Sequence, residues 1–348
     1  MPVKCDTRKA TSVPATHLEK TVAYTQIDNK RKAHPSLRHV RNIGNDTKMP
    51  YFTFNYLNSV AITTFYKTVG DIHSSPPLIF LHGGPGAGCE DQYPLAEPLA
   101  AAGIPSIHYD QVGCGRSSRL RDKGEEPSFW TFDLFCAQLD RLIDDLGVRE
   151  KGFFLHGQSW GGMLASTYSA RRPKGLRKLV VANSPSSAAV FEREILPLFK
   201  ALPVSEEVLR LDREERYRDP VYQEALARFA KKHFCLLDPW PDVLDGTVCE
   251  ESTNMVLMWG TPGKGVSRTR ITGPLKDYDA TVMAREINVP TLLLSGRYDF
   301  MTDGMMKPWF DLIPKVKWAV LEKSSHMSSL EEPERYLELL NGFLSELD

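Results

Sequence analysis

Ser159, Asp299 and His326 are side chains of the types that nucleophilic catalysis requires. A serine hydroxyl is a weak nucleophile until a base takes its proton, and a third group must orient that base. Each of the three follows a short apolar run that we predict to be a β-strand, and residues that follow parallel strands gather at one edge of a sheet. The chain order serine, aspartate, histidine therefore predicts a nucleophile, an orienting acid and a general base.

Each of these residues also has a plainer interpretation. Asp299 is of a type that often caps a helix, and a histidine in a loop is commonly a hydrogen-bonded surface residue. Asp303 competes for the role of the acid. We prefer Asp299 because it follows the predicted strand more closely.

The serine lies in the run GQSWGG, residues 157–162, between an apolar run and a segment rich in good helix formers. A serine at such a strand-to-helix turn must adopt a strained backbone to expose its hydroxyl, and the glycines at 157 and 161 leave room for that turn. The run predicts a nucleophile elbow at Ser159.

A second glycine-rich run, HGGPG at residues 82–86, also follows a predicted strand. A tetrahedral intermediate carries a negative oxygen that needs two aimed N–H donors. We expect these donors from the Gly83 and Gly84 segment and from Trp160, the residue after the nucleophile. The alternative is a phosphate-binding loop, but the run lacks both the lysine ending of a P-loop and the GxGxxG spacing of a dinucleotide site.

Apolar strands alternate with helices through most of the chain, which favours an α/β fold with a mostly parallel central sheet and helices on both faces. The predicted strands cover residues 52–56, 60–66, 77–81, 106–109, 153–155, 179–182, 291–294 and 318–321. The first two suggest an antiparallel hairpin at a sheet edge. Residues 131–146 and 160–171 have helical spacing or composition.

Changes in composition and in the pattern of strands and helices along the chain predict its domain organisation. Residues 1–49 carry scattered charges without a period and form an N-terminal extension. Residues 50–184 and 285–348 form the α/β core. Between them, residues 185–284 are mainly helical and rich in charges and prolines, which suggests an inserted helical cap over the carboxyl ends of the strands.

Composition narrows the classes of partner. The 348 residues carry a formal net charge of -1. The protein therefore has no net positive charge that would attract nucleic acid or an anionic membrane. The six cysteines show neither CxxC spacing nor a zinc-type cluster, and the charged first residues do not resemble a secretory signal. We therefore expect a cytoplasmic protein with reduced thiols, no metal and no cofactor, acting on a small molecule or short peptide. The sequence does not give the oligomeric state.

Three runs in order, residues 82–86, 109–117 and 157–162, resemble the proline iminopeptidase (prolyl aminopeptidase) family of serine α/β-hydrolases. The resemblance extends from about residue 51 to the carboxyl terminus and includes the cap segment 220–225. It implies the α/β-hydrolase fold with a cap, and hydrolysis of an amide next to a free amino or imino terminus. The reaction would pass through an acyl-enzyme without a metal.

The resemblance also implies that cap carboxylates bind the charged amine of the substrate, and Glu224 matches one of them. Glu224 could instead pair with Arg228 on a solvated helix face. Where the family carries a second carboxylate, residues 259–265 read WGTPGKG, and Leu236 replaces an expected arginine. These departures argue against strict specificity for N-terminal proline.

Three further functions are considered for these residues. The altered cap suggests an esterase, a lactone hydrolase or an acyl-transferring enzyme of specialised metabolism with the same machinery. A binding protein descended from a hydrolase is disfavoured because candidates for every catalytic role are present. Epoxide hydrolase or dehalogenase chemistry would need a carboxylate in place of Ser159.

Overall fold

The structure of the protein is a computed structural model that describes residues 50–348 except 58, 125, 245–252, 261–264 and 347–348. The predicted extension, residues 1–49, lies outside the described residues. Residues 48–348 form one compact unit.

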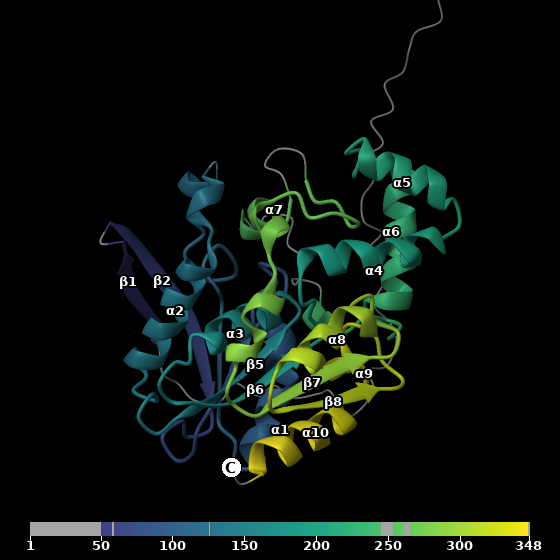
Figure 1. Ribbon diagram of the computed structural model, residues 1–348. Helices are drawn as coiled ribbons and strands as arrows, with labels where there is room; N and C mark the ends of the chain where they lie inside the picture. The colour runs from purple at the N-terminus through teal and green to yellow at the C-terminus, as the bar shows by residue number, and fades with distance from the viewer. Residues whose placement is uncertain (1–49, 58, 125, 245–252, 261–264, 347–348) are drawn as a thin grey trace, which may run out of the picture. The chain divides into compact units, whose positions relative to one another are not determined.

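A single eight-stranded sheet runs through the described unit (Figure 1). The strand order is β1-β2-β4-β3-β5-β6-β7-β8. The strands are β1 Tyr51–Tyr56, β2 Val60–Val69, β3 Leu78–Leu81, β4 Ser106–Tyr109, β5 Phe153–Gln158, β6 Leu176–Ala182, β7 Thr291–Gly296 and β8 Val316–Leu321. β1 pairs with β2, and β2 with β4, in antiparallel register, whereas all later neighbours are parallel. The predicted edge hairpin and mostly parallel sheet are confirmed.

Alternating residues of the central strands pack on opposite faces of the sheet. Leu78 and Phe80 of β3 join one hydrophobic cluster, which includes Leu340 of helix α10 (Pro333–Ser345). Ile79 and Leu81 join a second, larger cluster, which includes Leu139 of helix α2 (Phe132–Asp145). Because helices cover both faces, β3, β4, β5 and β7 are buried along their whole length. This explains the apolar runs LIFL of β3, FFL of β5 and LLL of β7, whereas β4 also buries polar side chains.

The helices of the core flank this sheet. They are α1 Ala96–Ala101, α2 Phe132–Asp145, α3 Trp160–Ala170, α8 Asp303–Leu312, α9 Ser328–Glu331 and α10 Pro333–Ser345. Short 3₁₀ segments are η2 Glu90–Leu95, η3 Arg121–Lys123, η4 Pro127–Phe129, η5 Asp242–Leu244, η6 Pro274–Asp277, η7 Ala280–Val282 and η8 Ala284–Glu286. α2 begins as predicted because the Thr131 hydroxyl accepts a hydrogen bond from the amide of Leu134.

The segment predicted as a cap is mainly helical where it is described. Its helices are α4 Ala188–Lys200, α5 Ser205–Arg213, α6 Pro220–His233 and α7 Thr253–Met258. The buried carboxylate of Asp212 on α5 accepts hydrogen bonds from the hydroxyls of Tyr222, Ser267 and Thr269, and so links α5 to α6 and to the segment 267–269. The cap belongs to the same compact unit as the core, so its predicted boundaries, 185 and 284, remain a prediction.

The cysteines that the structure describes are unpaired. Cys89, Cys114, Cys136 and Cys235 are buried and free, while Cys5 and Cys249 lie outside the described residues. Within the described ranges, every helix is too short or too polar to cross a bilayer.

Candidate active site

Ser159 lies at the turn between β5 and α3, as predicted. Its backbone has φ 57° and ψ −122°, a region that costs a residue with a side chain about 1–3 kcal/mol. Glycines make the turn possible, because a Cβ atom at Gly157 would overlap the carbonyl oxygen of Gly161, and one at Gly161 would overlap that of Leu81. The fold therefore holds Ser159 in a strained backbone conformation that a serine in an ordinary turn would not adopt.

Asp299 and His326 are joined by a buried hydrogen bond. Their atoms His326 Nδ1 and Asp299 Oδ1 lie 2.9 Å apart, and both side chains are almost completely buried. The amide of Met301 also donates to Asp299 Oδ1, at 2.8 Å. Because a carboxylate accepts hydrogen bonds, this contact places the imidazole proton on Nδ1 and leaves Nε2 as an acceptor.

Asn183, which no sequence motif singled out, completes the surroundings of the acid. Its Nδ2 atom donates to Asp299 Oδ2 at 2.6 Å and to the carbonyl of Ser325 at 3.3 Å. Its Oδ1 atom accepts from the Ser328 hydroxyl. Asn183 thus links the loop of the acid to the loop of His326. The signal available in the sequence was its position directly after β6, where a polar residue follows a strand.

Asp303, the competing acid, is engaged elsewhere. Its carboxylate is about half exposed and lies 3.3 Å from Arg297, which also pairs with Glu322. Of the two aspartates, only Asp299 contacts the imidazole.

The loops that carry Ser159 and His326 are in contact. Gln158 donates a hydrogen bond through Nε2 to the carbonyl of His326, at 3.2 Å. The residues between β3 and η2, 82–89, form the glycine loop. A Cβ atom on Gly83 of this loop would lie 3.3 Å from the Cβ of Ser159, so the glycine loop packs against the serine. The hydrogen bonds of the described residues include none between Ser159 Oγ and the His326 ring. Such bonds are often long in an enzyme without substrate.

The expected oxyanion donors are available. In the part of the chain that the structure describes, the amides of Gly83, Gly84 and Trp160 donate to no other residue. Gly84 has φ +113°, which favours glycine. These free N–H groups border the serine from two sides, at the glycine loop and at the start of α3.

His82 and Gln111 hold the beginning of the glycine loop. The amide of Gln111 donates to His82 Nε2 at 3.0 Å, so His82 Nδ1 carries the proton and donates to the carbonyl of Gly83 at 2.9 Å. Burial lowers the pKa of His82, which keeps the ring neutral. The side chain of Gln111 contacts the carbonyl of His82 and the indole of Trp160.

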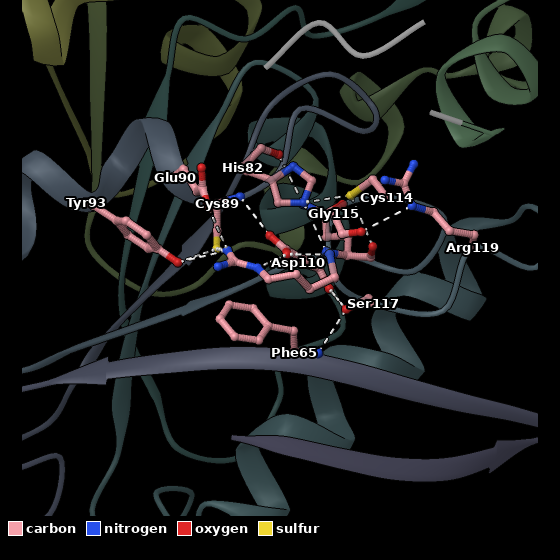
Figure 2. A network of polar contacts seen from close by, with 12 residues as sticks. Phe65, His82, Cys89, Glu90, Tyr93, Asp110, Cys114, Gly115, Ser117 and Arg119 are labelled. Atoms are coloured by element: carbon pink, nitrogen blue, oxygen red, sulfur yellow. Dashed lines mark hydrogen bonds and ion pairs between the residues drawn. The ribbon is translucent and has the colours of Figure 1, made fainter. Parts of the chain in front are cut away.

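Asp110 holds the far end of the same loop (Figure 2). Its carboxylate accepts from the amide of Cys89 at 3.0 Å, and from the amide and Nε of Arg116 at 2.8 and 3.1 Å. Burial favours a raised pKa for Asp110, but the hydrogen bonds from Arg116 and Cys89 outweigh it and lower the pKa. Arg116 also lies over the ring of Phe65 and donates to the hydroxyl of Tyr93.

The predicted cap contacts the candidate site through the end of α6. The amide of His326 donates to the carbonyl of His233 at 3.3 Å, and the amide of Met327 donates to that of Phe234 at 3.0 Å. The rings of Phe300 and Phe234 lie 4.3 and 5.6 Å from the imidazole of His326, measured between centroids. The surroundings of the imidazole are therefore largely aromatic.

Glu224 is not brought to these residues. Its side chain is 67% exposed and pairs with Arg228 at 2.7 Å, one turn further along α6. This is the surface ion pair considered as the alternative in the sequence. Residues 261–264, part of the cap segment that departs from the family pattern, lie outside the described residues.

A surface hollow of about 400 Å³ lies at the opposite end of the sheet. It is lined by Arg172, Arg177 and Lys315 near the amino ends of β6 and β8, whereas the candidate catalytic residues follow carboxyl ends. Both arginines have protein partners, Glu286 and the carbonyl of Lys151. Over the described ranges no group of three or more histidine, cysteine, aspartate or glutamate residues is arranged to hold a metal.

Comparisons with known proteins agree with this architecture. Residues 76–333 match the family model described as the alpha/beta hydrolase fold. The chain is 33% identical over 310 residues to a proline iminopeptidase of Lactobacillus helveticus, covering 86% of this chain and 98% of that protein. The chain belongs to the α/β-hydrolase family. Within that family it is a homologue of the proline iminopeptidases, as the three sequence motifs indicated.

Two solved structures resemble this α/β-hydrolase over most of its length. The crystal structure of a proline iminopeptidase from Mycobacterium smegmatis is 30% identical, with a TM-score of 0.75, and covers 85% of this chain and 97% of its own. The crystal structure of VinJ is 38% identical, with a TM-score of 0.78, and covers 86% of this chain and 99% of its own.

Proposed function

We propose that this α/β-hydrolase is a serine hydrolase with Ser159 as nucleophile, His326 as general base and Asp299 as the orienting acid. The observation that carries the proposal is the buried hydrogen bond of 2.9 Å between His326 and Asp299. It is supported by the strained strand-to-helix turn at Ser159, whose neighbour Gln158 bonds to the carbonyl of His326. His326 Nε2 takes the proton of Ser159 as the hydroxyl attacks a carbonyl carbon. The base later returns the proton to the leaving group, and water hydrolyses the acyl-enzyme.

The oxyanion of the tetrahedral intermediate is bound by the free amides of the Gly83 and Gly84 segment and of Trp160. Removal of one such donor typically costs about 10² to 10³ in rate. The chemistry uses no group beyond these residues and water, so we expect activity without an added metal or cofactor.

The substrate class we favour is a small amide or short peptide with a free amino or imino terminus. Support comes from the homology to proline iminopeptidases over 86% of the chain. Glu224 is not part of this proposal, because an exposed carboxylate paired with Arg228 is poorly suited to bind a desolvated ammonium group.

A second candidate, an esterase, lactone hydrolase or acyl-transferring enzyme, is favoured by the aromatic surroundings of His326. Phe234 and Phe300 offer apolar surface rather than an anion at this edge of the site. The same triad serves both candidates, and the substrate decides between them.

Labelling and turnover test the proposal together. We expect a fluorophosphonate probe to label the wild-type protein at Ser159, and Ser159→Ala to lose labelling and about 10⁶-fold in kcat. Ser166→Ala is the matched control, since Ser166 is a buried serine of the same helix whose hydroxyl bonds to the carbonyl of Gly162. An active Ser159→Ala variant would refute the assignment.

A substrate panel then separates the two candidates. Proline and alanine arylamides are compared with simple aryl esters, with Ser159→Ala as the blank. Cleavage of the arylamides supports the aminopeptidase or amidase function. Cleavage of esters without any arylamide turnover supports the second candidate.

A further inference from the structure

We propose that Gln111 is a positioning residue that holds the two halves of the oxyanion hole in a fixed relation. This inference rests on the proposed function and adds to it a residue that touches neither the substrate nor the triad. Gln111 is completely buried and follows β4, outside both catalytic motifs.

Three polar groups of Gln111 bond to the segments that carry the oxyanion donors. Its amide donates to His82 Nε2 at 3.0 Å, and its Nε2 donates to the carbonyl of His82, also at 3.0 Å. Its Oε1 accepts from the indole Nε1 of Trp160 at 2.7 Å. The chemistry of the partners fixes the orientation of the side-chain amide, because an indole N–H only donates and a carbonyl only accepts.

These bonds determine where the oxyanion donors point. In a trans peptide the C=O and the following N–H point in opposite directions within one plane. The bond from Gln111 to the carbonyl of His82 therefore orients the N–H of Gly83. The ring of His82, fixed in turn by the amide of Gln111, donates to the carbonyl of Gly83 and so orients the N–H of Gly84.

The other half of the hole is held through Trp160. Its indole is buried and bonded to Gln111 Oε1, while its amide is a free donor at the start of α3. One glutamine side chain thus spans the glycine loop and the first residue of α3. Without it, the two donor groups lose their only shared hydrogen-bonding partner among the described residues.

The chain offers a matched control in Gln138. It is equally buried. Its Oε1 accepts from the amide of Val112, and its Nε2 donates to the hydroxyl of Thr64 and, at 3.3 Å, to the carbonyl of Asp110. Among the described residues Gln138 makes no hydrogen bond to the glycine loop or to Trp160. Its loss therefore reports the cost of burial and of support for the backbone of residues 110–112, without the direct bonds that the Gln111 side chain makes.

The experiment compares Gln111→Leu, Gln111→Glu and Gln138→Leu with the wild type and with Ser159→Ala. The measurements are kcat and KM on the best substrate of the panel, the rate of Ser159 phosphonylation by the fluorophosphonate, and thermal unfolding. We expect Gln111→Leu to lower both kcat and the phosphonylation rate by about 10²-fold, the scale of a catalytic group misplaced by about 1 Å, with a similar KM. We expect Gln138→Leu to lower stability but to retain the wild-type kcat.

Gln111→Glu adds a pH signature that a merely structural role would not produce. When the introduced carboxyl group is protonated, it can donate to the carbonyl of His82 and accept from Trp160. When it is ionised, it loses the donor and places a negative charge beside the oxyanion. We expect kcat of this variant, relative to wild type, to rise as the pH falls. This variant, nearly identical in shape, also covers the case in which Gln111→Leu fails to fold.

Two outcomes contradict the proposal in different ways. If the wild type is labelled and active, Ser159→Ala is inactive and the Gln111 variants keep wild-type kcat, the positioning role is wrong and the serine hydrolase function stands. If the wild type is neither labelled at Ser159 nor active, both proposals fail. A loss of kcat in Gln138→Leu as large as in Gln111→Leu assigns the effect to general destabilisation and overturns the positioning role.

Discussion

Asp299 and Asp303 lie four residues apart, but their surroundings differ in every respect that matters for catalysis. Asp299 is buried and accepts hydrogen bonds from His326, Asn183 and Met301. Asp303 is about half exposed and pairs with Arg297. A comparison of Asp299 and Asp303 can therefore test what turnover requires. It shows whether the contact of a carboxylate with the imidazole is needed, or only a negative charge nearby.

We expect Asp299→Asn to lower kcat by about 10⁴-fold. An asparagine amide would donate to His326 Nδ1, which moves the ring proton to Nε2 and leaves no acceptor for the proton of Ser159. Asp303→Asn is the control and is expected to keep its activity. Steady-state kinetics on one substrate at neutral pH compares them, and equal losses in the two variants would contradict the role of Asp299.

At this scale the sequence predicted Ser159 from its motif, and Asp299 and His326 because each follows a strand in the required chain order. It gave no role in the site to Asn183 or to Gln111, although Gln111 lies in the run 109–117. Their bonds join loops that are far apart in the chain, and no spacing or periodicity reports such contacts. For Glu224 the sequence left two alternatives open, and the helical position of Arg228 four residues later matches the contact that the structure contains.

At the scale of elements, the glycine loop is the part of the site that depends most on its neighbours. It contains few side chains that could pack, so its shape is imposed from outside. His82 and Gln111 hold one end, and Asp110 holds the other at Cys89. The buried carboxylate of Asp110 is therefore expected to contribute to stability as well as to the site.

We expect Asp110→Asn to lower the free energy of unfolding by about 3 kcal/mol, the lower end for breaking a buried ion pair, because Arg116 is partly exposed and solvent screens its charge. Glu90→Gln removes the exposed partner of the same arginine and is expected to cost less than about 1 kcal/mol. Urea unfolding at neutral pH measures both. A loss for Glu90→Gln equal to that for Asp110→Asn would contradict the importance of burial.

The elements themselves were predicted well where their patterns were strong. β4 has the predicted bounds, and α2 and α3 differ from prediction by a residue or two. β5 continues to Gln158 and β6 begins at Leu176, beyond the apolar runs, because ladder hydrogen bonds to neighbouring strands extend both of them. The apolar pattern does not predict such extensions, because the added residues at the strand ends are mostly polar.

For the whole molecule, buried histidines link stability to pH. His108 and His156 flank the ring of Phe80 in the core below the site. Burial lowers the pKa of each to about 3. In the unfolded chain both titrate near 6.5, so between about pH 6 and 4 the unfolded state binds more protons and the folded state loses stability as the pH falls.

Each such histidine contributes a slope of about 1.4 kcal/mol per pH unit in this window. We expect His108→Phe to reduce the slope of unfolding free energy against pH by this amount, since phenylalanine can also stack on Phe80. His73→Gln, a change at an exposed histidine, is measured beside it for comparison. Urea unfolding at several pH values between 4 and 7 measures the slopes, and an unchanged slope for His108→Phe would show that this ring is protonated in the folded protein.

The attachment of the end of α6 to the loop of His326 has a consequence for engineering. Backbone bonds from His326 and Met327 to His233 and Phe234 make the last turn of this helix part of the support of the imidazole. We therefore expect a chimaera that takes the helices of the predicted cap from a homologue to keep its catalytic rate only if the crossover leaves residues 233 and 234 native. Recombination upstream of that point is expected to change selectivity, whereas recombination through it is expected to displace His326, the proposed proton acceptor.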